Sequence, residues 1–153
     1  IRDVFTGRKG WTETPDGTVT EKKERELANK KIDADFHAYL NFKKNYPTIK
    51  LQGVEQFAGK KVYAIKMTPR KGDTDTFYFD AVTGLVAGVS STAEMQGQEV
   101  KTSVLFRDYK AVDGVQIPHT LKLEEPASAA FTIRLESVKH NIKDPGKWFK
   151  KAK

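Results

Sequence analysis

Apolar and polar residues alternate along four stretches of the chain, with the period of two that is typical of β-strands burying one face. In FTIRLES, Phe131 and Ile133 alternate with polar residues, and in VKTSVLFRDY, Val104 and Phe106 do the same. The stretches KKVYAIKM and GVQIPHTLKLEE follow the same rule. The remaining residues predicted to face inward are Tyr63, Ile65, Met67, Val115, Ile117, Leu121, Leu123 and Leu135.

Short polar turns that contain glycine separate these stretches, among them FAGKK, AVTGL and AVDGV. Turns of this length join neighbouring strands as hairpins, and glycine supplies the positive φ that they require. The sequence therefore predicts a long antiparallel meander. In FYFDAVTGL, Asp80 opens such a turn and Gly84 closes it, so a turn-forming role is favoured over a catalytic or metal-binding one. Asp73 and Asp75 follow Gly72 and are interpreted as part of a solvated hairpin tip.

One segment, from about Glu21 to Asn45, departs from this pattern. It is rich in Lys, Glu, Ala and Leu, it lacks glycine, and Pro47 lies just beyond it, which predicts one or two helices. Asp33 or Asp35 could cap the second of two helices. Four residues at helical spacing are predicted to share one face: Ile32, Phe36, Tyr39 and Leu40.

The expected fold class is mainly antiparallel β with a helical insertion (α+β). Seven to nine strands would span roughly 35 to 40 Å, whereas a helix is about 10 to 12 Å across. One helical segment cannot cover such a face, so the sheet must curl around the helix, close into a barrel, pair with another chain, or leave an apolar concavity open to a ligand. A curled sheet filled by its own side chains is the alternative to that concavity.

Length and composition limit the function classes. The chain has 153 residues, which predicts a single domain over residues 1–153, and its net charge is +7. That charge is compatible with binding to anionic lipid or to acidic partners, and it does not distinguish between them. The chain has no cysteine, which excludes disulfides and thiolate chemistry. No apolar run reaches the roughly 20 residues of a membrane-spanning helix.

Candidate chemistry is sparse. His37, His119 and His140 are scattered without the spacing of a metal site, so no metal or other cofactor is expected. No serine has the context of a nucleophile, and we expect no catalysis. Exposed aromatics beside basic residues could bind nucleic acid, but Phe77 and Phe79 share the face that a core would use. No nucleic-acid partner is therefore expected.

The order of the elements resembles a known family. The stretches FTGRKGWTETPDGTV, YFDAVTGLVAGVSS and LFRDYKAVDGVQIPHTLKL, and the tail IKDPGKWFKKAK, are similar to those of the LolA-like superfamily of outer-membrane lipoprotein-sorting and lipoprotein-binding proteins. The resemblance implies an incomplete barrel with helices over its open side, in the periplasm or cell envelope. Members usually have a helix and two or three further strands before this point, so we expect the sequence to be part of a longer chain.

Together these arguments predict a noncatalytic envelope domain that shelters an apolar ligand, such as a lipid or the acyl chains of a lipoprotein, and that serves in transport. A protein–protein interaction or sensor module with a filled interior is the alternative, with an envelope protein as its partner. The candidate cavity-lining residues are Phe36, Tyr39, Leu40, Ile65, Phe77, Phe79, Val104, Phe106, Ile117, Leu121, Phe131 and Ile133.

Overall fold

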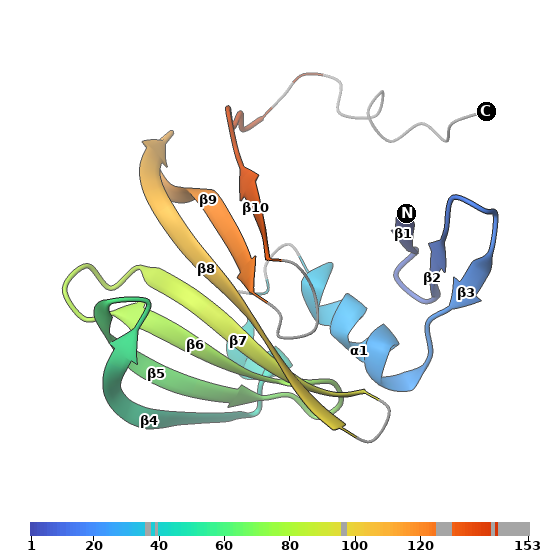
Figure 1. The fold of residues 1–153 in the computed structure, drawn as a ribbon, viewed down its shortest axis with the longest axis horizontal. Coiled ribbons are helices and arrows are strands. Elements are labelled where there is room, and N and C mark those ends of the chain that lie inside the picture. Colours follow the sequence, from blue (N-terminus) through green and yellow to red (C-terminus); the bar gives the residue numbers. More distant parts are fainter. Residues whose placement is uncertain (36–37, 39, 96–97, 125–129, 142, 144–153) are drawn as a thin grey trace.

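The computed structural model describes residues 1–153 except 36–37, 39, 96–97, 125–129, 142 and 144–153. The described part contains strands and two helices, coloured along the chain in Figure 1. The elements are β1 (Arg2–Phe5), β2 (Gly10–Glu13), β3 (Val19–Glu21), α1 (Glu24–Asp33), α2 (Phe42–Asn45), β4 (Thr48–Phe57), β5 (Lys60–Thr68), β6 (Thr74–Asp80), β7 (Val86–Met95), β8 (Gln98–Val112), β9 (Val115–Glu124) and β10 (Phe131–Arg134).

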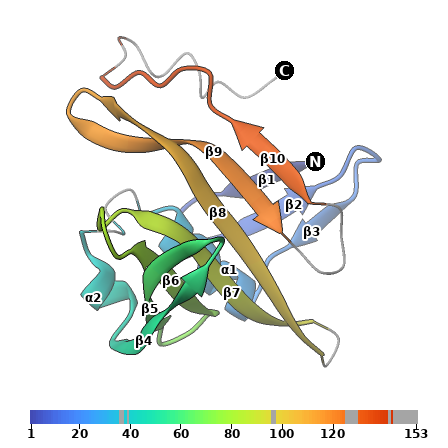
Figure 2. The same ribbon diagram turned by 60° about the vertical axis from the view of Figure 1, so that its left-hand side comes forward.

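The strands form two antiparallel sheets, one of three strands in the order β1-β2-β3 and one of seven in the order β10-β9-β8-β7-β6-β5-β4. Each strand of the larger sheet pairs with its neighbour in the sequence, which confirms the predicted meander. The sheet curls without closing into a barrel, and β4 and β10 form its two edges. Figure 2 shows the curl and the length of β8, which joins the two halves of the sheet. The predicted fold class is confirmed.

Two of the predicted hairpin turns have the backbone that a two-residue loop requires. Asp113 and Gly114 both have positive φ, and so do Ala58 and Gly59. The residues on either side of each pair are cross-strand partners, as in type I′ turns, whose twist matches that of the flanking strands.

Asp80 has the predicted turn-forming role. Its carboxylate oxygen Oδ1 accepts hydrogen bonds from the backbone N–H groups of Val82 (2.9 Å) and Thr83 (3.0 Å). Its Oδ2 lies 2.8 Å from Nζ of Lys60. Lys60, followed by the two backbone donors, holds the pKa of Asp80 well below its ordinary value. The Gly84 N–H closes the turn onto the Asp80 carbonyl at 2.9 Å, with the Gly84 φ at 71°.

The described part of the helical segment contains two helices, in agreement with the prediction of one or two, but they cover less of the segment than its predicted bounds. α1 ends at Asp33 and α2 has only four residues, while residues 36, 37 and 39 lie outside the described part. Asn41 precedes α2 at the cap position without a side-chain hydrogen bond, so the prediction of Asp33 or Asp35 as its cap is wrong. Carboxylates at a helix C-terminus oppose the macrodipole, and that is a physical reason for α1 to end here.

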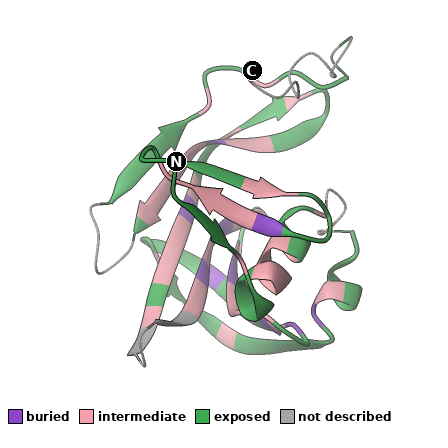
Figure 3. Cartoon of the chain, turned by 90° about the vertical axis from the view of Figure 1, so that its right-hand side faces the viewer, coloured by how far each residue is buried: buried purple, intermediate pink, exposed green. Residues whose placement is uncertain are grey.

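α1 lies between the larger sheet and the small one (Figure 1). The small sheet is tied to it by Asp3, whose carboxylate pairs with Lys30 of α1 at 2.6 Å and with Lys22 at 3.3 Å. Figure 3 shows that most buried positions lie in the strands of the larger sheet. The helix therefore acts as a cover for one face of the sheet.

The larger sheet buries side chains on both faces. Val62 and Ala64 of β5 are almost fully buried on the outer face, where they cluster with Tyr78 and Ala87. Tyr63 is 45% exposed, so the prediction that β5 buries only the face of Tyr63, Ile65 and Met67 is wrong. The alternation seen in the sequence applies to a sheet with one wet face, whereas this strand has apolar neighbours on both sides.

Phe57 covers the outer face, and a bulge in β4 places it there. The pairing register of β4 with β5 shifts by one residue between Leu51 and Gly53. A one-residue shift moves every later side chain to the opposite face. The Phe57 ring then stacks on Tyr78, with ring centroids 3.9 Å apart and an interplanar angle of 11°.

This stacking requires a glycine at position 88, opposite Tyr78 on β7. A Cβ atom at Gly88 would lie 2.5 Å from the Phe57 ring and 2.6 Å from the Val104 carbonyl oxygen. We expect Gly88→Ala to lower the free energy of unfolding by about 1–3 kcal/mol, because neither the ring nor the backbone can move freely. Gly10→Ala is the control, since its Cβ would make contacts no closer than 3.4 Å. Equal urea midpoints for the two variants would contradict this packing.

A second prediction concerns the Asp80 turn. Because the folded-state pKa of Asp80 is depressed, its ionised form stabilises the fold above the unfolded pKa, and this contribution is lost as the pH falls below about 3.8. We expect Asp80→Asn to lower the thermal midpoint at pH 7 and the gap to wild type to narrow steadily on acidification. A pH-independent gap would mean that the charge of Asp80 has no role in stability.

Candidate ligand cavity

A partly open cavity of about 840 Å³ lies between the helical segment and the concave face of the larger sheet. Its volume falls within the range of roughly 300–1,000 Å³ that is usual for small-molecule sites. The apolar residues that line it are Ile32, Ala38, Phe42, Tyr46, Ile49, Ile65, Met67, Phe77, Phe79, Val86, Val89, Val104 and Phe106. The polar ones are Asn29, Asp33, Asp35, Asp73, Asp75 and Ser91.

Aromatic side chains form much of the apolar wall. Phe77 and Phe79 lie on the same face of β6, with ring centroids 6.4 Å apart. Tyr46, which follows α2, meets Phe77 edge-on, with centroids at 6.3 Å and an interplanar angle of 78°. The three rings belong to one packed cluster with Met67 and Ile65 of β5, and this cluster lines the partly open cavity.

The lining becomes polar toward the start of β6. Along β6, Asp75 precedes Phe77 and Phe79 on the same face, and across the sheet Asp75 is opposite Ser91, while Phe77 is opposite Val89. Successive residues on one face of a strand lie about 6.6 Å apart. The cavity therefore has a polar end and an apolar end, which meet along β6 between Asp75 and Phe77.

Asp75 is held in place at this polar end. Its Oδ1 accepts a hydrogen bond from Ser91 Oγ at 2.5 Å, and its Oδ2 accepts one from the Tyr46 hydroxyl at 2.7 Å. Burial raises the pKa of Asp75, and the charge of Asp73 adds to the increase, while the two hydroxyl donors oppose it. A hydrogen-bonded carboxylate thus faces a partly desolvated space.

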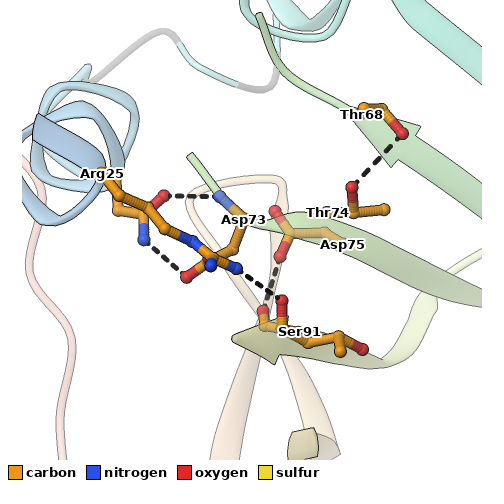
Figure 4. A network of polar contacts seen from close by, with 8 residues as sticks. Arg25, Thr68, Asp73, Thr74, Asp75 and Ser91 are labelled. Atoms are coloured by element: carbon orange, nitrogen blue, oxygen red, sulfur yellow. Dashed lines mark hydrogen bonds and ion pairs between the residues drawn. The ribbon is translucent and has the colours of Figure 1, made fainter. Parts of the chain in front are cut away.

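Asp73 fastens α1 to the sheet, as Figure 4 shows. Arg25 pairs with Asp73 Oδ1 through its Nε and donates from its Nη2 to the Thr92 carbonyl at 3.2 Å. Asn29 donates to Asp73 Oδ2 at 2.6 Å and accepts from the Asp73 N–H at 2.9 Å. Two side chains one turn apart on α1 therefore bind one residue next to β6, and this fixes the helix over the polar end.

Asp33, the last residue of α1, completes the acidic rim with Asp35. Burial raises the pKa of Asp33, with Asp75 and Asp3 adding to the increase and Lys30 opposing it. The side chain still reaches solvent, as expected of a group at the mouth of a cavity. Asp35 accepts a hydrogen bond from Asn45 at 3.3 Å.

The structure brings together five of the twelve residues predicted to line a cavity, which are Ile65, Phe77, Phe79, Val104 and Phe106. Ile117 and Leu121 lie on β9, beyond the lining. Leu40 is 81% exposed, and Phe131 and Ile133 on β10 are about half exposed. Phe36 and Tyr39 lie outside the described residues.

The polar part of the lining was not predicted from the sequence. The interpretation of Asp73 and Asp75 as a solvated hairpin tip is wrong, because Asp73 binds α1 and Asp75 is partly buried against Tyr46. A signal was present in the sequence: Asp75, Phe77 and Phe79 share the period of one strand face, so a carboxylate stands on the face assigned to the core.

Within the described residues, no group of three or more His, Cys, Asp or Glu side chains is arranged to hold a metal ion. His119 is buried, with its Nδ1 3.0 Å from the Ile117 carbonyl oxygen, and His140 Nδ1 lies 3.0 Å from an Asp113 carboxylate oxygen. None of the helices in the described part is long and apolar enough to span a membrane.

The architecture is similar to that of two solved structures. A DUF1329 family protein from Desulfovibrio piger matches with a TM-score of 0.52 and 18% identity, over 81% of this chain and 55% of that one. An outer membrane lipoprotein-sorting protein domain from Vibrio parahaemolyticus matches with a TM-score of 0.51 and 16% identity, over 87% and 62%. The predicted LolA-like fold is confirmed. The chain matches no protein-family profile and no curated protein sequence.

This chain spans 55% and 62% of the two structures, so each match covers only part of the neighbouring protein. At identities below a fifth, the likeness shows the LolA-like fold alone. The fold accounts for the curled sheet beneath a helical cover. It does not determine which side chains line the cavity.

The raised pKa of Asp33 gives a third prediction. A carboxyl group whose pKa is higher in the folded state favours folding below the unfolded pKa and loses this contribution as the pH rises through the folded value. We therefore expect Asp33→Asn to raise the thermal midpoint at pH 7.5, by on the order of 1 °C because solvent screens the site. The difference should vanish near pH 3.5. A lower midpoint at pH 7.5 would show that the Asp33 charge is stabilising.

Proposed function

We propose that this protein is a noncatalytic binding domain of the bacterial cell envelope that shelters the apolar part of a lipid or an acylated lipoprotein. The observation that carries the proposal is the open cavity of about 840 Å³ with aromatic and aliphatic walls. Transfer of an apolar chain from water into contact with side chains such as Phe77, Phe79 and Val89 would be favourable. The gain in free energy is roughly 0.8 kcal/mol per buried CH₂.

The description of one structural neighbour supports the same class of function. That neighbour is described as an outer membrane lipoprotein-sorting protein domain. The present chain has the same fold and a cavity on its concave face. We therefore assign it to the periplasm or cell envelope, with transport or sorting of an apolar ligand as its role and without a catalytic step.

The first experiment asks whether the protein carries a ligand. Native mass spectrometry of protein purified from bacterial envelope fractions, followed by solvent extraction, should show a bound apolar molecule. Nile red, a neutral dye whose fluorescence rises in apolar surroundings, should bind with saturation and be displaced by the extracted material. A protein that carries nothing and does not bind the dye would favour the alternative of an interaction module.

Val89→Phe tests whether the interior is open. Val89 lines the cavity from β7, so a larger ring should occupy ligand space, weaken Nile red binding several-fold and leave the free energy of unfolding nearly unchanged. In a filled interior the same change would cost about 1–3 kcal/mol through over-packing. Val82→Phe is the control, because Val82 is 91% exposed in the turn after β6 and lies outside the lining. Marked destabilisation by Val89→Phe with unchanged dye binding would refute the cavity.

A further inference from the structure

The charge of the cavity is opposite to that of the whole chain. The protein carries a net charge of +7, yet the described residues that line the cavity include four aspartates and neither lysine nor arginine. All four lie at the polar end, around the C-terminal half of α1 and the start of β6. Side chains of one sign in a partly closed cleft produce a local potential that the overall charge does not predict.

Only some of this negative charge is used by the fold itself. Arg25 neutralises Asp73, and the two residues serve to hold α1. Asp75 accepts hydrogen bonds from two neutral hydroxyl groups, which orient its carboxylate and leave its charge uncompensated by them. Asp33 has Lys30 as its nearest favourable charge, but Lys30 makes its ion pair with Asp3.

The position of Asp33 is electrostatically unfavourable for α1. A carboxylate in the last turn of a helix opposes the macrodipole, which favours lysine or arginine there. The negative charge of Asp75 also disfavours the ionised form of Asp33 and contributes to the raised pKa of Asp33. The fold therefore tolerates an unfavourable pair of carboxylates at the polar end, where a positive group in the cavity would stabilise both.

From this charge complementarity we infer that the cavity takes an amphiphile with an apolar chain and a protonated amine, whose chain lies along Phe77 and Phe79 and whose ammonium group lies between Asp33 and Asp75. The inference rests on the proposed function, because it specifies the ligand of the same cavity. The register supports it, since Asp75 and Phe77 are successive residues on one face of β6 and the carboxylate therefore lies next to the aromatic rings. An ammonium group would also offset the effects that raise the pKa of both carboxyl groups.

Three probes with the same twelve-carbon chain test the inference: dodecylamine, dodecanol and dodecanoic acid. Each is titrated against the Nile red complex at pH 7, below its micelle concentration and at low salt. We expect dodecylamine to bind about tenfold more tightly than dodecanoate, with dodecanol between them, and this difference to shrink at 0.5 M salt. Equal affinities for amine and carboxylate would overturn the inference.

Variants of Asp33 connect the preference to the site. Asp33→Asn should reduce the ratio of amine to carboxylate affinity by about threefold, and Asp33→Lys should reduce it further, while dodecanol affinity changes less than that of either charged probe. Asp33→Lys is expected to fold, because lysine suits a helix C-terminus. Asp108→Asn is the matched control, since Asp108 is exposed on β8, has a positive φ that asparagine tolerates and lies outside the lining. A ratio unchanged in both Asp33 variants would contradict the assignment of Asp33 to the ammonium group.

Lysolipids identify the source of the amine. Two lysolipids with the same chain are compared, one with an ethanolamine headgroup and one with a glycerol headgroup. If the amine belongs to a phospholipid, the ethanolamine lysolipid should bind more tightly. Preference for dodecylamine without this difference would assign the site to an amine that is not part of a phospholipid. Failure of dodecanol and Nile red to bind at all would refute the proposed function, whereas their binding without an amine preference would refute the present inference alone.

Discussion

The concave face of the larger sheet carries more apolar surface than the helices can cover. Seven strands at about 4.8 Å each span about 34 Å, whereas the ten residues of α1 extend about 15 Å and α2 adds a single turn. The uncovered remainder must stay open, be filled from elsewhere, or hold a ligand. Both the cavity and the curl of the sheet follow from this imbalance, because curling brings the apolar strands closer to the little cover that exists.

Polar contacts rather than apolar packing position that cover. α1 has no fully buried residue, and it reaches the sheet through Arg25 and Asn29, which both bind Asp73. Hydrogen bonds and ion pairs fix direction more sharply than apolar contacts do, so the helix can be held at one place while the space beneath it remains unfilled. Ile32 is its main apolar contribution to the aromatic wall.

The sequence predicted the strands and the meander well, because alternation and glycine turns are local signals. It also predicted the inward face of β6 with Phe77 and Phe79, and the turn formed by Asp80. It failed where residues distant in the sequence decide the outcome. The shift at Gly53 moves Phe57 to the outer face, and the acidic rim arises only when the end of α1 meets the start of β6. Neither arrangement produces a periodic pattern in the sequence. The only local signs were a glycine inside a strand, Gly53, and an aspartate on a face predicted to be core, Asp75.

The outer cluster of Val62, Ala64, Tyr78 and Phe57 lies on the side of the sheet opposite the cavity. The sheet therefore has a source of stability that does not share side chains with the cavity. Substitutions among the cavity residues can change what is bound without weakening this cluster. A scaffold with this separation can diversify its ligands over evolution while it keeps its fold, and that is consistent with structural neighbours that retain the architecture at 16–18% identity.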